Sequence, residues 1–347
     1  MASVPLGYGD SMEKIMKKIS RRVLVTGAYG FLGKYVITEF LDNGYTVVAF
    51  GRNKQKMSAL KQQYPEIELA YGDLCSSSDC LKATKNINIV AHLGALSTVW
   101  GKRSDFLKTN VDGTKNILEA CRKNKVNKLV YISSPSIYAG KSDKLDIDED
   151  DYDRCNKLNY YIESKILAEK AIEKYDDINW TILRPRGLFG VGDTSIVPRL
   201  IHANKKIGLP LFGGGRNYVD MTCVENVAYA VRLAAESKKS SHKIYNITND
   251  EPQEFKGLLE ELFKQFGETP RYKNINLRFA ISAATAIESI YKVFHIYKEP
   301  PITKYTICTL GYSQTLNIDK AKRDLGYKPK MTLSEGIEKY ATSHQKC

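Results

Sequence analysis

The sequence predicts an α/β fold in which a doubly wound parallel sheet is followed by a smaller C-terminal lobe. From residue 22 onward, short β-branched apolar runs alternate with longer amphipathic stretches, and this alternation is typical of repeated βαβ units. The first apolar run leads directly into a glycine-rich loop and then into a helical stretch. The chain has 347 residues, which is enough for one large α/β unit with an appended lobe.

The apolar runs follow one another in a regular order. We expect six or seven strands joined by crossover helices, which is the doubly wound layout. The expected strands cover RVLVTG (22–27), YTVVAFG (45–51), IELAYGDL (67–74), NIVAHLGA (88–95), KLVYISS (128–134) and WTILRP (180–185), and the main helices cover 31–43, about 112–124 and about 160–175. The predicted organisation is a flexible leader over 1–20, with Met12 as a candidate native start, a nucleotide-binding domain over 21–185, and a lobe over 186–347 interwoven with it.

Composition excludes several classes of protein. The 52 basic and 39 acidic residues give a net charge of +13, but the basic residues are spread singly among acidic ones, as on solvated helix faces. A phosphate-bearing cofactor or an acyl carrier is the alternative reason for the surplus, and no nucleic-acid-binding module is recognisable. The seven cysteines are scattered without a C-x-x-C pair, which favours a reducing cytoplasm.

Other kinds of active site lack their signatures. The five histidines have no metal-ligand spacing, so we expect no metal site. A hydrolase is disfavoured because the G-x-S-x-G motif of a nucleophile elbow does not occur. Cys223 stands in an apolar context and is interpreted as a core residue rather than a nucleophile.

The loop after the first strand has the glycine spacing of a dinucleotide site. VLVTGAYGFLG places glycines at 27, 30 and 33 between a strand and an amphipathic helix. Gly27 permits a tight turn, Gly30 lets backbone N–H groups approach a pyrophosphate, and Gly33 allows close packing of helix on strand. These positions predict a Rossmann-type nucleotide-binding domain.

The second strand ends without the acidic residue that grips a ribose 2′-hydroxyl. Gly51 stands at that position and Arg52 follows it. An arginine suits a 2′-phosphate, so we favour NADP over NAD, with Arg52 as a plain surface residue in the alternative. Asp73 ends the next strand and is a candidate partner for the adenine amine, or equally a loop-capping residue.

NYYIESKILAEK carries the strongest candidates for proton transfer. Tyr161 and Lys165 are four residues apart, so both lie on one face of the expected helix. We expect the Lys165 ammonium to lower the pKa of the Tyr161 phenol, which ordinarily lies near ~10, and to hold the cofactor ribose. Tyr160 is a competing candidate, but it points to another side of the helix.

The strand VYISS ends in hydroxyl groups beside the expected nicotinamide position. We select Ser134 as the group that hydrogen-bonds the reacting carbonyl, with Ser133 and Ser136 as alternatives. In the reductive direction hydride comes from C4 of the nicotinamide, Tyr161 delivers a proton, and Ser134 orients the developing alkoxide. A non-catalytic NAD(P)-sensing protein is disfavoured, because it has no use for a tuned phenol.

Taken together, these motifs resemble those of the extended short-chain dehydrogenase/reductases, the superfamily of NAD-dependent epimerases and dehydratases. The resemblance covers about 22–338 and rests on TGAYGFLG, GDL, AHLGA, KTNVDGT, SSPSIYAG, YIESK and RPRGLFG in family order. It implies a Rossmann-type doubly wound parallel sheet with a smaller C-terminal substrate-binding lobe, and a homodimer. It also implies an NAD(P) site that comprises Gly27, Tyr29, Gly30, Phe31, Leu32, Gly33, Arg52, Asp73, Leu74, Leu93, Ala95, Asn110, Tyr161, Lys165 and Pro185, with Ser134, Tyr161 and Lys165 catalytic.

Two branches of this superfamily compete. Nucleotide-sugar epimerases and dehydratases usually carry an Asn where this chain has Gly187 and an Arg where it has Val219, so groups that would hold a diphosphate are missing. The segments 219–230, 245–252 and 300–329 resemble the 3β-hydroxysteroid dehydrogenase-like branch instead. We therefore predict a dehydrogenase or reductase acting on a hydrophobic 3-hydroxysteroid or a 3-oxo/3-hydroxy acyl compound, with a sugar-nucleotide epimerase as the rival.

One apolar helical segment, 276–297, stands apart from the motifs. Its apolar residues recur at helical spacing, and we expect a core helix packed on the lobe. A lid over an apolar substrate or a peripheral membrane contact is the alternative, since Arg278, Lys292 and Lys298 suit an anionic lipid surface.

Overall fold

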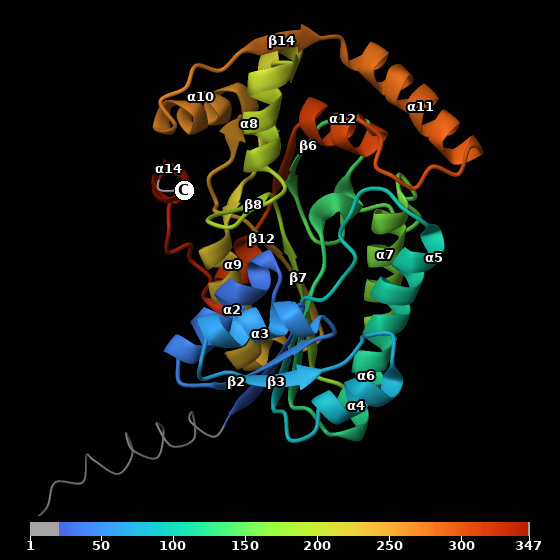
Figure 1. Cartoon of the computed structure of the whole chain (residues 1–347), viewed down its shortest axis with the longest axis vertical. Helices are drawn as coiled ribbons and strands as arrows, with labels where there is room; N and C mark the ends of the chain where they lie inside the picture. Colours follow the sequence, from blue (N-terminus) through green and yellow to red (C-terminus); the bar gives the residue numbers. More distant parts are fainter. Residues whose placement is uncertain (1–20, 346–347) are drawn as a thin grey trace, which may run out of the picture.

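A seven-stranded parallel sheet forms the centre of the molecule (Figure 1). The computed structural model describes residues 21–345, so the predicted leader and Met12 lie outside the described residues. In spatial order the strands are β12 (Lys243–Ile247), β7 (Trp180–Pro185), β5 (Lys128–Ile132), β4 (Ile89–His92), β1 (Arg22–Thr26), β2 (Thr46–Gly51) and β3 (Glu68–Tyr71). The prediction of a doubly wound parallel sheet is confirmed.

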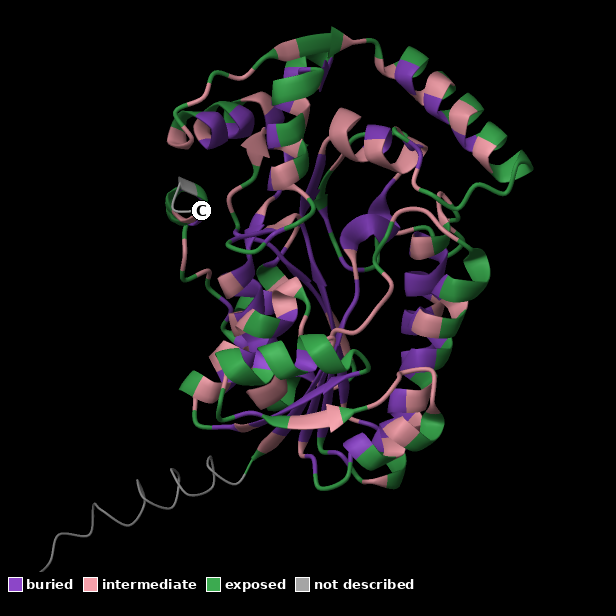
Figure 2. Ribbon diagram, in the orientation of Figure 1, coloured by how far each residue is buried: buried purple, intermediate pink, exposed green. Residues whose placement is uncertain are grey.

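Helices cover both faces of this sheet (Figure 1). One face carries α2 (Phe31–Asp42), α3 (Lys54–Gln63), α9 (Val224–Glu236) and α13 (Asp319–Leu325). The opposite face carries α4 (Ser77–Ala83), α6 (Gly113–Lys123) and α7 (Tyr160–Ile172). The inner strands are buried on both sides, which is why they are continuous apolar runs rather than alternating ones (Figure 2).

The helix expected over about 112–124 begins earlier than predicted. Helical backbone starts at α5 (Arg103–Phe106) and passes through a π-helical stretch, η1 (Leu107–Asp112), into α6. The π-helical stretch shifts the phase of the side chains around the helix axis. It contains Thr109 and Asn110, which both belong to the surroundings of the site described below.

The smaller lobe lies beyond the carboxyl ends of the strands (Figure 1). Its core joins Phe189, Leu211 and Leu259 with Leu333 near the end of the chain. The lobe elements are β6 (Lys144–Ile147), β8 (Leu188–Phe189), α8 (Val197–Lys206), β9 (Leu209–Phe212), β10 (Tyr218–Val219), β11 (Thr222–Cys223), β13 (Gln253–Glu254), α10 (Phe255–Gln265), β14 (Tyr272–Ile275), α11 (Leu277–Val293), α12 (Lys304–Gly311), β15 (Gln314–Leu316) and α14 (Leu333–Gln345), with short 3-10 turns η2 (Pro135–Tyr138), η3 (Gly213–Gly215) and η4 (Lys238–Ser240) elsewhere.

The chain crosses between the two units several times. β6 comes from the first part of the sequence but joins a small sheet with β15 and β10 of the lobe. Conversely, β12 and α9 come from the second part but complete the central sheet and its helical layer. Cys223 is buried at the end of β11.

The helix α11 is not the core helix that its periodicity suggested. Of its seventeen residues only Ala280, Ala284 and Glu288 are buried, and its outer side is exposed (Figure 2). The two alanines pack against Phe212 and Ile307, so only one side of the helix is in contact with the lobe. Periodicity predicted an apolar stripe correctly, but the helix also carries exposed apolar side chains outside the packed side, at Phe279, Ile290 and Val293.

Candidate active site

The glycine-rich loop joins β1 to α2 with the backbone that the sequence predicted. Gly27 has a φ of +67°, and a Cβ atom at Gly33 would stand only 2.4 Å from the Gly27 carbonyl oxygen. Gly30 caps α2 without a side-chain hydrogen bond, so the first N–H groups of the helix are available to an anion. The loop therefore fits the pyrophosphate of a dinucleotide.

A groove of about 550 Å³ runs from this loop across the carboxyl ends of β1, β2, β4, β5 and β7. The parallel register aligns those strand ends, and so it brings together loops that are far apart in sequence. The predicted residues that line the groove are Gly27, Tyr29, Gly30, Phe31, Leu32, Gly33, Arg52, Asp73, Leu74, Leu93, Ala95, Ser134, Tyr161, Lys165 and Pro185.

Asn110 is the one predicted residue that does not line the groove. It is almost fully buried, its Oδ1 accepts from the Leu96 N–H at 2.7 Å, and its Nδ2 donates to the Leu96 carbonyl at 3.0 Å. Nδ2 also donates to the Ser164 hydroxyl at 2.9 Å. Asn110 thus ties the loop after β4 to α7 and helps to place the Tyr161 helix, rather than contacting the groove.

Arg52 and Asp73 meet at the outer end of the groove. The Arg52 Nη1 donates to the Asp73 carboxylate at 3.0 Å, and this pair lowers the pKa of Asp73 together with the hydrogen bond from the Cys75 backbone, which is the larger effect. An acidic side chain at position 51 is impossible without movement, since a Cβ there would approach the Tyr29 ring to 2.7 Å. The end of β2 therefore presents a cation and no carboxylate of its own.

Tyr161 and Lys165 project from the first turns of α7 into the inner end of the groove. Asn159 starts this helix, because its side chain accepts a hydrogen bond from the Ile162 N–H at 2.8 Å. Ser134 precedes η2 at the end of β5 and accepts from the Ser136 N–H at 3.2 Å. Three side chains from two elements thus converge beside Pro185 of β7.

Burial dominates the electrostatics of this group. It raises the pKa of the Tyr161 phenol to about 12, and the Ser134 hydroxyl opposes part of that rise. It also lowers the pKa of the Lys165 ammonium to about 7, with Glu169 acting in the opposite direction. Both shifts favour the neutral forms, as expected for ionisable groups removed from water.

The expected lowering of the Tyr161 pKa by Lys165 is therefore wrong for the protein alone. Lys165 Nζ donates to the Ile132 carbonyl at 2.8 Å and to the Tyr131 hydroxyl at 3.2 Å. It lies 6.0 Å from the centre of the Tyr161 ring, too far to offset the loss of hydration. In this arrangement Lys165 is a hydrogen-bond donor at the floor of the groove.

Sequence reasoning missed the segment that follows β8. Thr194 and Ser195 line the groove opposite the glycine loop, and Asp193 fixes them by accepting from the backbone N–H groups of Ser195 at 2.7 Å and Val197 at 2.9 Å. Tyr35 of α2 donates to the nearby Val191 carbonyl at 2.8 Å. The signal was present as GVGDTS, a turn followed by hydroxyl groups, but nothing local indicated which groove it would cover.

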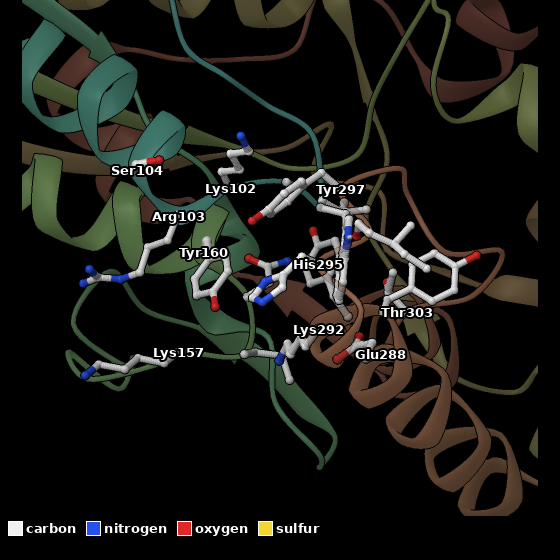
Figure 3. A pocket seen from close by; sticks show the side chains of 18 residues that line it. Lys102, Arg103, Ser104, Lys157, Tyr160, Glu288, Lys292, His295, Tyr297 and Thr303 are labelled. Atoms are coloured by element: carbon white, nitrogen blue, oxygen red, sulfur yellow. Dashed lines mark hydrogen bonds between the residues drawn. The ribbon is translucent and has the colours of Figure 1, made fainter.

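A second pocket, of about 390 Å³, lies between the start of α7 and α11, and Tyr160 in its lining directly precedes Tyr161 of the groove (Figure 3). Its walls are aromatic, and its rim carries Lys102, Lys157 and Lys292. Tyr160 lies here rather than in the groove. The aromatic residues that line this pocket are Trp100, Tyr160, Tyr291, Tyr297 and Tyr305.

Comparison with known proteins agrees with this geometry. Residues 23–248 match the model of the NAD dependent epimerase/dehydratase family. The chain belongs to that family. Its members include a 2-alkyl-3-oxoalkanoate reductase of Shewanella oneidensis, 30% identical over 96% of this chain and 88% of the relative. The human sterol-4-alpha-carboxylate 3-dehydrogenase (decarboxylating) is 32% identical over 96% of this chain and 90% of the relative.

Solved structures of the family share the fold. The crystal structure of gox2253 aligns with a TM-score of 0.76 at 24% identity, over 93% of this chain and 98% of that one. A UDP-glucuronic acid 4-epimerase of Bacillus cereus, in complex with NAD, aligns with a TM-score of 0.72 at 23% identity, over 93% of this chain and 99% of that one. The family match and the two relatives at 30% and 32% identity identify the protein as an NAD(P)-dependent oxidoreductase of the extended short-chain type, on the hydroxysteroid dehydrogenase-like branch. Within residues 21–345 no helix is long and apolar enough to cross a membrane.

Proposed function

We propose that the enzyme interconverts a secondary alcohol and a ketone at the 3-position of a hydrophobic substrate, which is either a 3-oxo or 3-hydroxy acyl compound or a 3-hydroxysteroid. The observation that carries this proposal is the convergence of Ser134, Tyr161 and Lys165 at the groove, next to an aromatic pocket. By their names, both relatives act on acids in which a single carbon atom lies between the carboxylate group and the reacting carbon.

The proposed roles follow from what each side chain offers. A bound nicotinamide supplies or accepts hydride at the reacting carbon. In ketone reduction the protonated Tyr161 phenol gives its proton to the developing alkoxide, and Ser134 donates a hydrogen bond to the same oxygen. Lys165 binds the cofactor ribose and, when protonated, favours the phenolate that remains. Oxidation of the alcohol reverses each transfer.

We further propose that NADP is preferred over NAD. Arg52 supports this preference, because it lines the groove just after β2, where its guanidinium could bind a 2′-phosphate, and position 51 has no carboxylate for a 2′-hydroxyl. Asp73 would then release Arg52 and accept from the adenine amine.

We also propose that the outer side of α11 contacts an anionic lipid surface. The exposed fractions of Phe279, Val293 and Phe294 are each 71%, and that of Ile290 is 53%. Lysines and an arginine at the two ends of this stripe give it the character of an interfacial helix. Because the same helix forms a wall of the aromatic pocket, a membrane-dissolved substrate would reach that pocket directly.

Absorbance at the nicotinamide band tests the main proposal. Purified protein is offered NADPH or NADH with hydrophobic ketones, 3-oxo acids and UDP-sugars. We expect net oxidation of the cofactor with a 3-oxo acid. Interconversion of UDP-sugars without net cofactor consumption would instead identify an epimerase and overturn the proposal.

A further inference from the structure

Arg186 is a buried arginine that no acidic side chain neutralises within ion-pair distance, as far as residues 21–345 are concerned. It follows Pro185 of the cofactor groove and is only 6% exposed. Its Nη1 donates to the side-chain oxygen of Gln314 in β15, whereas Nε has no hydrogen-bond partner. A buried guanidinium without an anion is costly, so its retention needs a reason.

The neighbouring Arg184 shows how the same fold neutralises an arginine with a structural role. Arg184 is fully buried, and Glu169 receives its Nε at 3.0 Å and its Nη2 at 2.5 Å. In the described part of the chain, Arg186 has no carboxylate that accepts from two of its nitrogens in this way. The nearby Asp220 attracts Arg186 without forming an ion pair with it: a carboxylate oxygen of Asp220 accepts from the Leu316 N–H at 2.7 Å. Burial raises the pKa of Asp220 to about 6, and the charge of Arg186 opposes part of that rise.

The free edge of Arg186 has the shape of a carboxylate site. With Nη1 engaged by Gln314, the adjacent Nε and Nη2 groups donate to no side chain or carbonyl of the described residues. These two N–H groups form the planar fork that binds a carboxylate through two parallel hydrogen bonds.

Residues close to Arg186 line both cavities of the active site. Pro185 before it and Leu188 after it line the cofactor groove. Tyr305 lines the aromatic pocket, and it is close enough to both Arg186 and Tyr161 for its charge to act on their pKa values. Tyr305 packs in the cluster that contains Ile162, next to Tyr161, and Leu316, two residues from Gln314. The neighbours of Arg186 in the chain and in the packing thus belong to the walls of both cavities.

We propose that Arg186 binds the carboxylate of the substrate, and that the enzyme thereby selects 3-oxo and 3-hydroxy acids over neutral ketones. This inference rests on the proposed function and adds the group that recognises the acid. In such an acid one carbon separates the carboxylate from the reacting carbon. A single short chamber can therefore hold the ketone oxygen at Ser134 and Tyr161 and the carboxylate at Arg186.

The test compares a 3-oxo acid with its uncharged analogue. Wild-type protein, Arg186→Met, Arg186→Lys and the control Arg199→Met are assayed with 3-oxododecanoate and with its methyl ester, in the presence of the preferred cofactor. Arg199 is exposed and paired with Glu299, so its substitution removes one positive charge elsewhere. We expect Arg186→Met to raise KM for the acid roughly 10- to 150-fold, because the variant loses the hydrogen-bonded ion pair between the guanidinium and the substrate carboxylate. KM for the ester stays within twofold, and Arg186→Lys recovers part of the affinity for the acid.

A second measurement does not depend on the variant folding. The wild-type protein should bind 3-hydroxydodecanoate at least tenfold more tightly than its methyl ester when either competes with the substrate. Equal affinity for acid and ester, or an equal loss of both in Arg186→Met, would overturn the carboxylate site while leaving the reductase intact. If neither these compounds nor the panel of hydrophobic ketones and 3-oxo acids oxidises the cofactor, the proposed function itself is overturned, and the carboxylate site with it.

Discussion

Replacing Arg52 by Met should weaken the binding of NADPH and leave that of NADH nearly unchanged. The guanidinium would contact the 2′-phosphate, which only NADPH carries. Hydrogen bonds to charged groups contribute about 1.5–3 kcal/mol. Arg52 must first leave Asp73, 3.0 Å away, and an exposed ion pair of this kind is worth up to about 1 kcal/mol. The difference of about 2 kcal/mol corresponds to roughly a 30-fold change in the ratio of the two affinities.

The assay is a titration of each protein with NADPH and with NADH, followed by the fluorescence of the reduced nicotinamide. Lys85→Met is the matched control, because Lys85 is exposed in the turn between α4 and β4, toward the amino ends of the strands, and its loss changes the net charge equally. Since the Arg52 side chain is 69% exposed, the effect should shrink as salt rises. A ratio that stays within twofold of the wild-type value would refute the assignment of Arg52, and Arg52→Asp should shift the preference further toward NADH.

The other predictions concern catalysis, stability and surface contact. Tyr161→Phe should lower turnover about 10²- to 10⁴-fold at unchanged cofactor affinity; full turnover would reject Tyr161 as the acid. Because burial raises its pKa to about 12, the phenol is protonated at neutral pH. Ketone reduction should therefore be insensitive to Tyr161 ionisation there, whereas alcohol oxidation, which needs the phenolate, should rise with pH; the opposite slopes would contradict this. Glu169→Ala should lower the free energy of unfolding, measured in urea, by roughly 3–5 kcal/mol, because it leaves the buried Arg184 without its ion-pair partner. A decrease below about 1 kcal/mol would show that the pair is dispensable. The double variant Ile290→Asp, Val293→Asp should abolish sedimentation with vesicles that contain phosphatidylserine, and unchanged sedimentation would exclude α11 as the contact.

Local motifs made much of the fold and site predictable. The glycine loop combines a strand, a turn and a helix start within eleven residues, so its geometry follows from the backbone needs of Gly27 and Gly33 alone. Tyr161 and Lys165 share a helix face by spacing, and Ser134 ends a strand that the apolar pattern identifies. Parallel register then brings these segments together at one edge.

Features set by distant contacts could not be predicted. The bond between Arg186 and Gln314 joins residues 128 apart, and no pattern around either indicates the other. The direction of the Tyr161 pKa shift depends on burial and on where Lys165 finds its acceptors, which the spacing does not reveal. Periodicity identified the stripe on α11, but whether protein covers such a stripe is decided by the remainder of the lobe.

The loop after β7 supports the proposed substrate class. Gly187 has a φ of +59°, and a Cβ atom there would stand 2.6 Å from the Asp220 carbonyl oxygen, so this backbone cannot carry the asparagine typical of sugar-nucleotide enzymes. The glycine lets Thr222 of β11 come close, with its hydroxyl donating to the Arg186 carbonyl. The same contact fixes the backbone from which the Arg186 side chain extends. The loop thus excludes a polar side chain that would hold a diphosphate, and it holds the backbone of the arginine that we propose as the carboxylate site. If Arg186 binds the carboxylate, both effects favour a compact acid over a nucleotide sugar.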